Sequence, residues 1–520
     1  MNYTEADRFA REWRSLAKYA EDLKKKMPSE YADVFYQLVY YPVVAGAGTA
    51  EIYTELAKAD QYAKQGRSSA AVALRKAQDL FEKDKQLSDF YNSEKMAGGK
   101  WKNMMSDKHI GYTQWSMPRD NSLPRISRMP ELAAEAMLGV AVEGSEKAAP
   151  HQVESLTLPT FDMLSVSRFD RSDAEKRTTY PGEPVMKRRN MVWAVEDGGC
   201  PVTLFNRSDK GSITCMLKAD QPWVRTAEFV TVEGTNDVTV FVGIDWEKFP
   251  GGKASATLTV TPVNGVIEEK PIGDPVRIAV NAVAPEKNAP KYREDMNEVY
   301  ATAAPAPIVI PAWDYVNKTG ANGANWKEVV GLGRWGNIGS YGGAMAVFPL
   351  PTPAVLPPNP APTLEYRVYI PEPGKVTVDV EIMPIFPDKD DTGLHGATYR
   401  ELRIGTAFDD EPVKVTDTLA REFKRLNNEI FENVRKVRVT HDVKEAGLHT
   451  FKVVMVDPVV AVERLVFYPE LVRRSNLGAP FTRPISRNTF VDPRPIEPKD
   501  ENLGEYLHGP DWREKRKKTQ

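Results

Sequence analysis

The spacing of apolar residues changes near residue 100, and this change constrains the fold more than any other feature of the chain. Up to about residue 96, apolar residues recur three and four positions apart, as in EADRFAREWRSLAKYAEDLKKKM (5–27), which predicts amphipathic helices. From about residue 155 the period becomes two, as in SITCMLKA and KVTVDVEIM, which predicts strands with one buried face. Helices and strands therefore occupy separate stretches, and the predicted fold is an α-helical bundle followed by two antiparallel β-sandwiches.

Prolines and glycines set the ends of the predicted helices. Pro28 ends the first helix, Pro42 must kink or break the second, and Gly66 suits the position just after a helix C-terminus. The second helix carries an apolar stripe that we expect to pack inside the bundle: Tyr31, Val34, Phe35, Leu38 and Val39.

The length of 520 residues suggests three or four domains. We expect a helical bundle with a long aromatic C-terminal loop at 1–150 and an immunoglobulin-like accessory sandwich at 151–286. A linker near 284–295 then leads to a second sandwich at 300–478. The proline- and arginine-rich residues 479–520 form an extended tail to which no chemistry is assigned.

The chain contains two cysteines, Cys200 and Cys215, which flank a predicted hairpin around NRSDKG. One cross-strand disulfide is possible there. Two buried thiols are the favoured alternative because a disulfide requires a narrow geometry.

Charge and motif patterns exclude several classes of function. The net charge of −3 predicts no nucleic-acid partner, and no stretch of about 18 apolar residues is present to span a membrane. GLGRWG (331–336) matches a dinucleotide-binding fingerprint, but prolines follow where a helix should begin, so the glycines are interpreted as turns or a bulge in the second sandwich. DKDDTG (388–393) resembles half of a calcium loop and is interpreted as a hairpin tip. The six histidines show no metal-ligand spacing, so we predict no cofactor and no metal site.

The segment GGKWKNMMSDKHIGYTQW (98–115) is the strongest functional candidate. Trp101, His109, Tyr112 and Trp115 place aromatic faces and a titratable group on one loop. Sugar rings present apolar C–H faces beside hydroxyl groups, which aromatic side chains with polar neighbours can bind. The alternative is that these aromatics only anchor the loop onto the bundle.

The same segment, followed by Pro118, resembles the helical domain of glycoside hydrolase family 115, the xylan α-1,2-glucuronidases. Further resemblance lies in FYQLVYYPVVAGAGTAEIYTELAKADQYAKQGRSSA (35–70), GLGRWGNIGSYGGAMAVFP, LEYRVYI, GLHTFKVVMVDPVVAVERLVF and SNLGAP. It covers most of residues 1–480, in the family's order, and the middle sandwich is similar to an extra domain of some members.

The resemblance implies the C-terminal half of such an enzyme, without the preceding catalytic barrel. No catalytic residue can be carried over, and we expect the chain to be inactive alone. Glucuronoxylan oligosaccharides and a second copy in a homodimer are the implied partners. His109, Tyr112, Trp115 and Arg119 are the candidates for the rim of a substrate site, and Arg119 or Arg125 would meet a uronic carboxylate.

Two alternatives stay open at this point: a stand-alone carbohydrate-binding or scaffold protein, and an incomplete gene model of a full-length α-glucuronidase. The compartment is open as well. Relatives are generally secreted or periplasmic, whereas MNYTEADRFAREWRSL lacks the apolar core of a signal peptide.

Overall fold

The computed structural model describes most of the chain in several stretches. These are residues 5–114, 116–163, 199–267, 269–284, 299–330, 332–333, 343–350, 352–384, 402–418, 429, 432–472, 478–479, 481–482 and 484. Some predictions fall outside the described residues: those on Trp115, most of the glycine run, DKDDTG and most of the tail.

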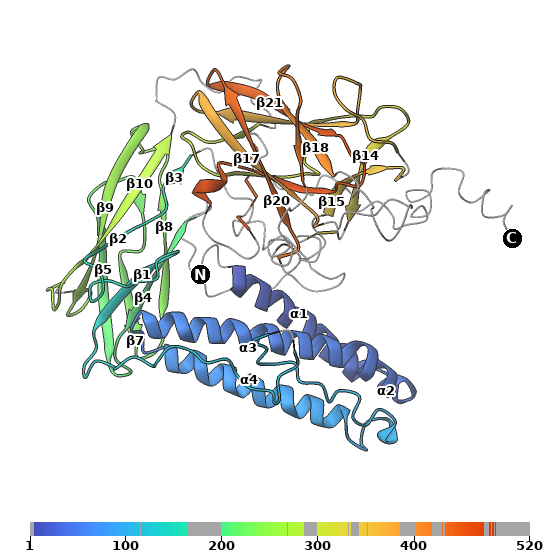
Figure 1. Ribbon diagram of the computed structural model, residues 1–520. Coiled ribbons are helices and arrows are strands. Elements are labelled where there is room, and N and C mark those ends of the chain that lie inside the picture. Colours follow the sequence, from blue (N-terminus) through green and yellow to red (C-terminus); the bar gives the residue numbers. More distant parts are fainter. Residues whose placement is uncertain are drawn as a thin grey trace.

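Helices fill the first part of the chain and strands fill the rest, as predicted (Figure 1). The helical elements are α1 (Glu5–Lys26), η2 (Ser29–Tyr31), α2 (Ala32–Phe35), η3 (Tyr36–Tyr40), α3 (Tyr41–Lys64), α4 (Ala70–Tyr91) and η4 (Ala97–Gly99). The long helices α1, α3 and α4 run side by side, with α3 in contact with both others. None of the described helices combines the length and the apolar character that crossing a membrane needs.

Pro42 is accommodated by a widened helical turn. The segment η3 is a π-helical turn, and α3 begins at Tyr41, with Pro42 in its first turn. A proline has no N–H to donate and its ring crowds the carbonyl four residues back, so a π-turn directly before it relieves both conflicts. The predicted break is therefore a local change of helix type.

Gly66 ends α3 as predicted. Its φ is +71°, a value that a residue with a Cβ rarely adopts. The amide of Arg67 donates to the Tyr62 carbonyl at 3.0 Å and the amide of Gly66 to the Ala63 carbonyl at 3.1 Å. This is the double hydrogen bond of a Schellman motif, and it turns the chain toward α4.

The predicted apolar stripe of the second helix is only partly buried. Phe35 lies in the interior, but Tyr31, Val34 and Leu38 are 56%, 54% and 66% exposed. The expectation that this stripe packs inside the bundle is therefore wrong for most of its members. The period showed which residues share a face but not whether another element covers that face.

The first sandwich packs a four-stranded sheet against a six-stranded sheet. The strand order is β1-β4-β8-β6 in one sheet and β2-β10-β9-β5-β7 in the other, with β3 also paired to β10. The strands are β1 (Leu138–Val142), β2 (Ser155–Thr157), β3 (Phe161–Asp162), β4 (Cys200–Asn206), β5 (Ser212–Ala219), β6 (Val224–Arg225), β7 (Phe229–Glu233), β8 (Val238–Ile244), β9 (Gly252–Val263) and β10 (Val276–Ala284). One apolar cluster joins side chains of both sheets. Strand β1 comes from residues expected to lie in the long loop of the helical region.

The connection between the two cysteines is not the predicted hairpin. Strand β4 pairs with β1 and β8, whereas β5 pairs with β7 and β9, so the chain crosses from one sheet to the other between them. The Asn206 Oδ1 atom accepts from the amides of Ser208 and Met137 and shapes this crossing. No disulfide joins Cys200 and Cys215, and both thiols are buried.

The second sandwich is formed by two six-stranded sheets. Their orders are β11-β16-β21-β18-β19, with β13 paired to β16, and β14-β15-β22-β17-β20, with β12 paired to β22. The strands are β11 (Tyr300–Ala301), β12 (Ile308–Pro311), β13 (Asn317–Thr319), β14 (Asn325–Val330), β15 (Gly343–Phe348), β16 (Thr363–Ile370), β17 (Gly374–Ile382), β18 (Arg403–Phe408), β19 (Lys414–Asp417), β20 (Arg435–Val443), β21 (Gly447–Met455) and β22 (Val462–Phe467), followed by η6 (Pro469–Leu471). Large buried side chains such as Trp326, Tyr366 and Phe451 fill the space between the sheets.

The sheets are mainly antiparallel, as predicted, and also contain some parallel pairs. Most pairs are antiparallel, but β2 and β3 pair with β10, and β11 with β16, in parallel. These short strands enter at sheet edges from long connections, so no tight hairpin forces them to run antiparallel. Gly333, in the glycine run, has φ +95°, and a Cβ there would lie 2.7 Å from the Cδ atom of Glu463.

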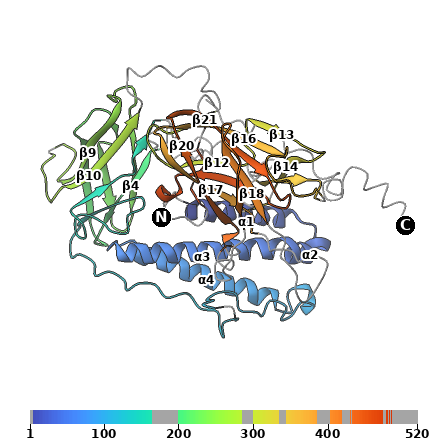
Figure 2. The ribbon, with the colours of Figure 1, turned by 45° about the horizontal axis from the view of Figure 1, so that its top comes forward.

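The helices are joined to the first sandwich by buried polar contacts at the start of α4. Arg67 Nη1 lies 2.9 Å from Asp237 Oδ2, and the Ser69 hydroxyl donates to the same oxygen. The Ser68 hydroxyl donates to the Asn206 carbonyl at 2.7 Å. These contacts fix the bundle against one end of the first sandwich, where α3 and α4 meet the green strands (Figures 1 and 2).

Candidate functional site

The aromatic loop is defined as residues 98–126, of which the structure describes 98–114 and 116–126. These residues lie along α3 and α4, where Ile110 is fully buried and Leu123 and Ile126 are partly buried. Ile110 is 0% exposed and packs with Ile52 and Leu56 of α3 and with Ala77 of α4. Apolar burial of this kind favours the attached state by about 2 kcal/mol for a side chain of this size. The hydrophobic effect thus positions the residues on either side of Ile110.

One edge of the His109 ring faces the bundle, and the side chain is 35% exposed. Its Nε2 atom lies 2.8 Å from Oδ2 of Asp84 on α4, a carboxylate whose side chain is 3% exposed. Its Nδ1 atom lies 3.3 Å from the backbone carbonyl of Asp107. The hydrogen bond to Asp84 raises the pKa of His109, while burial opposes the rise. The ring therefore links the loop to α4.

Hydrogen bonds within the loop give it a defined shape. The Asn121 Oδ1 atom accepts from the amides of His109 and Ile110 at 2.9 and 3.1 Å. The Gly111 amide donates to the Tyr53 hydroxyl at 3.3 Å. Gly111 has φ +96°, and a Cβ there would lie 2.6 Å from the Ser122 carbonyl oxygen, so the two limbs of the loop touch at this glycine.

A carboxylate on α3 holds the chain directly after the loop. Asp60 Oδ1 accepts from both the amide and the hydroxyl of Ser127, at 2.8 and 2.7 Å. Its other oxygen lies 2.6 Å from the Lys64 ammonium. Hydrogen bonds from Lys64 and Ser127 lower the pKa of Asp60 to about 2.

The structure separates the sequence-predicted rim residues into two groups. His109 faces the bundle, whereas Tyr112 is 48% exposed and Arg119 and Arg125 are also exposed. Trp115 lies outside the described residues. In the described part of the loop, no hydrogen bond or ion pair joins Tyr112 or Arg119 to His109. His109 therefore helps to anchor the loop, whereas Tyr112, Arg119 and Arg125 are exposed on it.

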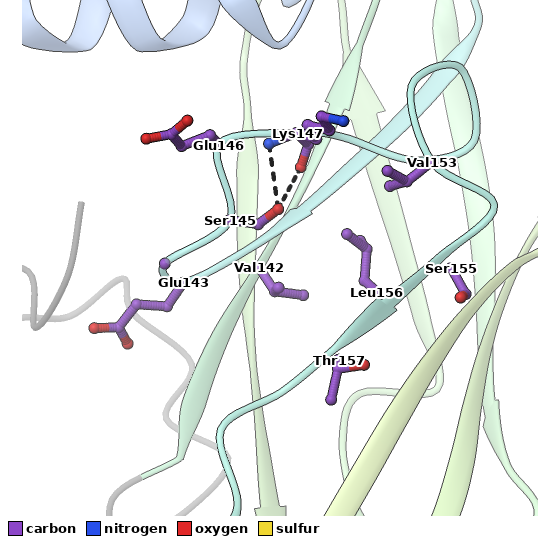
Figure 3. Close-up of a pocket in the computed structure, with 10 residues that line it drawn as sticks. Val142, Glu143, Ser145, Glu146, Lys147, Val153, Ser155, Leu156 and Thr157 are labelled. Atoms are coloured by element: carbon purple, nitrogen blue, oxygen red, sulfur yellow. Dashed lines mark hydrogen bonds between the residues drawn. The ribbon is translucent and has the colours of Figure 1, made fainter. Parts of the chain in front are cut away.

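A second feature, which the sequence did not indicate, is an open hollow of about 600 Å³ beside β1 and β2. It lies between the turn after β1 and the segment Val153–Thr157, with Glu143, Glu146 and Lys147 at its border (Figure 3). The Ser145 hydroxyl donates to the Lys147 carbonyl at 2.7 Å and shapes the turn. The labelled lining residues include no aromatic side chain, so the hollow lacks a stacking surface for a sugar ring.

The other described histidines are engaged in the framework. His151 lies 2.9 Å from the Gln65 carbonyl, and burial lowers its pKa. His441 lies 2.9 Å from the Thr406 hydroxyl, and burial lowers its pKa too. His449 lies 2.7 Å from Asp409. Within the described ranges, no three His, Cys, Asp or Glu side chains gather as metal ligands.

Comparison with known proteins gives one family match. Residues 305–481, about a third of the chain, match the glycosyl hydrolase family 115 C-terminal domain. A search of curated proteins gave no match.

Among solved structures, a family GH115 4-O-methyl-α-glucuronidase described as specific for decorated arabinogalactans is similar at 12% identity and a TM-score of 0.38. The match covers 90% of this chain and 34% of that one, so the chain spans about a third of that enzyme's length. A family 35 carbohydrate-binding module from Clostridium thermocellum is similar at 10% identity and a TM-score of 0.21, over 31% of this chain and 98% of that one. TM-scores this low carry no inference about activity or ligand. The family match over residues 305–481 is therefore the finding that relates this chain to glycosyl hydrolase family 115.

Proposed function

We propose that residues 1–520 are an accessory region of a glucuronoxylan-processing α-glucuronidase, and that they bind the substrate without cleaving it. The observation that carries this proposal is the family 115 C-terminal domain at residues 305–481. The resemblance of the aromatic loop to the helical domain of the xylan α-1,2-glucuronidases supports the choice of glucuronoxylan as the ligand.

The environment of several buried carboxylates supports the absence of cleavage. A glycosidase needs one carboxylic acid that holds a proton and a second carboxylate across the sugar. Asp379 instead accepts two hydrogen bonds from Arg438, at 2.7 and 2.9 Å. Asp457 pairs with Arg403 at 3.0 Å, and Glu381 pairs with the buried Arg464. Each of these three carboxylates is thus bound to a guanidinium of the protein framework.

Binding is assigned to the exposed face of the aromatic loop. Tyr112 offers a half-exposed ring to the C–H face of a sugar. Arg119 is exposed seven residues further along the same loop, and a guanidinium can bind a uronic carboxylate through two parallel hydrogen bonds. Ile110 and His109 attach the loop to the helices, and this attachment positions both groups.

Calorimetry with purified 1–520 tests the binding assignment. Xylo-oligosaccharides that carry 4-O-methylglucuronic acid should bind more tightly than unsubstituted ones. Tyr112→Ala should weaken both by about three- to tenfold. Arg119→Ala should weaken only the substituted ligands, because it removes the partner of the carboxylate. The matched controls are Tyr31→Ala, at a 56% exposed tyrosine on the bundle, and Arg128→Ala, at an exposed arginine beyond the loop.

The same preparations decide between the proposal and its alternatives. Incubation with glucuronoxylan should release no glucuronic acid, and release by the wild-type chain would contradict the lack of cleavage. If Tyr112→Ala and Tyr31→Ala change the binding affinity equally, the assignment of binding to the loop is contradicted. Equal affinity for substituted and unsubstituted xylo-oligosaccharides would favour a general carbohydrate-binding protein.

A further inference from the structure

The two ring nitrogens of His109 both face hydrogen-bond acceptors. Nε2 faces the Asp84 carboxylate at 2.8 Å, and Nδ1 faces the Asp107 carbonyl at 3.3 Å. A carbonyl oxygen cannot donate, and a neutral imidazole has only one N–H. Only the protonated ring, with an N–H on each nitrogen, satisfies both partners.

Loss of this proton would leave an unfavourable arrangement on the side of the ring that faces the buried Asp84. The Asp84 side chain is 3% exposed, and its Oδ1 atom is buried without a hydrogen-bond partner in the described part of the chain. A neutral His109 would remove the positive charge beside this carboxylate and turn a lone pair toward either Asp84 or the Asp107 carbonyl. Burying a charge without its counterion is costly.

The remaining described links between the loop and the helices do not change charge near neutral pH. Ile110 is apolar, and Asn92 exchanges hydrogen bonds with the backbone of Met105. The pKa of Asp60 is lowered to about 2, so its bonds to Ser127 persist. The Gly111 amide donates to Tyr53, a phenol.

The titratable groups near His109 come from three elements. Asp84 on α4 raises its pKa through a hydrogen bond, and Lys108 on the loop itself opposes that rise by charge repulsion. Tyr41 on α3 lies near Asp84, and burial raises the pKa of its phenol, so it stays neutral between pH 5 and 9 or so. His109 is therefore the group in this cluster whose charge changes in that range.

We propose that His109 and Asp84 form a pH-controlled latch, which holds the aromatic loop against α3 and α4 in acid and releases residues 109–114 and 116–121 as the pH rises. The sign follows from linkage. The folded-state pKa of His109 is raised, so the stabilisation is complete below the ordinary histidine value of about 6.5 and is lost as the pH rises through the raised value. The latch concerns loop attachment and does not depend on what the loop binds.

Hydrogen–deuterium exchange on the full chain tests this proposal. Peptides that cover residues 106–123 should be protected at about pH 5.5 and should lose that protection several-fold by about pH 8.5, after correction for the intrinsic pH dependence of exchange. Peptides from β9 and from the middle of α4 should keep theirs. Constant protection of residues 106–123 across this range would overturn the latch.

Substitution of the carboxylate gives the second arm. Asp84→Asn keeps the shape of the side chain but removes its charge. The protection of loop amides from exchange at pH 5.5 should therefore fall, and it should no longer depend on pH. Asp89→Asn, at an exposed carboxylate on the same helix, should behave like wild type. Imidazole NMR of ¹³C-labelled histidine adds a readout that needs no variant: one resonance should titrate above the ordinary range, and it should shift down in Asp84→Asn. A pH dependence that survives Asp84→Asn would also overturn the proposal.

Discussion

At the scale of single residues, buried ion pairs fix how the parts of the chain meet. Arg67 and Asp237 are 7% and 15% exposed and join the start of α4 to the first sandwich. The guanidinium also stacks over the rings of Tyr62 and Phe205, at 4.3 and 4.7 Å. Burial raises the pKa of Asp237 even though Arg67 lies beside it. Desolvation is therefore large here, and removal of one partner leaves the other charge uncompensated.

Substitution of Asp237 by alanine should be strongly destabilising for this reason. We expect a loss of about 3–5 kcal/mol, measured as a shift of the urea transition followed by helical circular dichroism. The matched control is Glu131→Ala, which breaks an ion pair with Arg128 whose side chains are 88% and 91% exposed. That change should cost no more than about 0.5 kcal/mol. Similar losses in the two variants would show that the buried pair does not hold the parts together.

At the scale of elements, the sequence located the strands well but not their partners. The predicted strand SITCMLKA coincides with β5, and KVTVDVEIM matches β17 to within one residue. Period-two alternation is a property of one segment and can be read locally. Whether β4 and β5 form a hairpin or cross between sheets depends on strands far away in sequence, so the local pattern around NRSDKG could not decide it.

The crossing of β4 and β5 predicts the chemistry of the two cysteines. Thiol titration with a chromogenic disulfide should report two thiols in denaturant and very slow reaction in the native protein. Both side chains are buried, and burial raises the pKa of Cys215 to about 12, which suppresses the reactive thiolate. Fewer than two thiols after denaturation without reductant would contradict the strand assignment.

At the scale of the whole molecule, the bundle leaves an apolar face uncovered by the described residues. Tyr31, Val34 and Leu38 are spaced three and four positions apart and are each more than half exposed. Exposed apolar side chains grouped on one face mark a surface that binds dyes or other protein surfaces.

Fluorescence of an anilinonaphthalene dye should therefore rise when it is mixed with the native chain. The double substitution Val34→Ser and Leu38→Ser should reduce that rise and any self-association seen by sedimentation, because it removes the apolar side chains at the centre of the face. Asp33→Asn, in the same turn, is the control and should change neither. A wild-type chain that binds no dye and sediments only as a monomer would contradict the assignment of this face.

The location of a ligand site on the aromatic loop stays a prediction. The sequence singled out the aromatic loop, and its exposed Tyr112 and Arg119 agree with a surface role. The orientation of His109 could not be predicted, because Asp84 lies 25 positions earlier on a helix and only the packing of Ile110 brings the two side chains together. The hollow beside β1 was not predicted either, because the segments that line it come together only when the first sandwich folds.

The sequence by itself determined the helical character of the first part of the chain, the strand character of most segments after it, where α3 ends at Gly66, and which side chains of each element share a face. These properties depend on residues a few positions apart. The tertiary structure alone decided which strands pair, which apolar face stays uncovered at Val34 and Leu38, and that His109 turns inward to Asp84. Those outcomes depend on which distant surfaces bury each other, and the spacing of residues along one segment does not specify that.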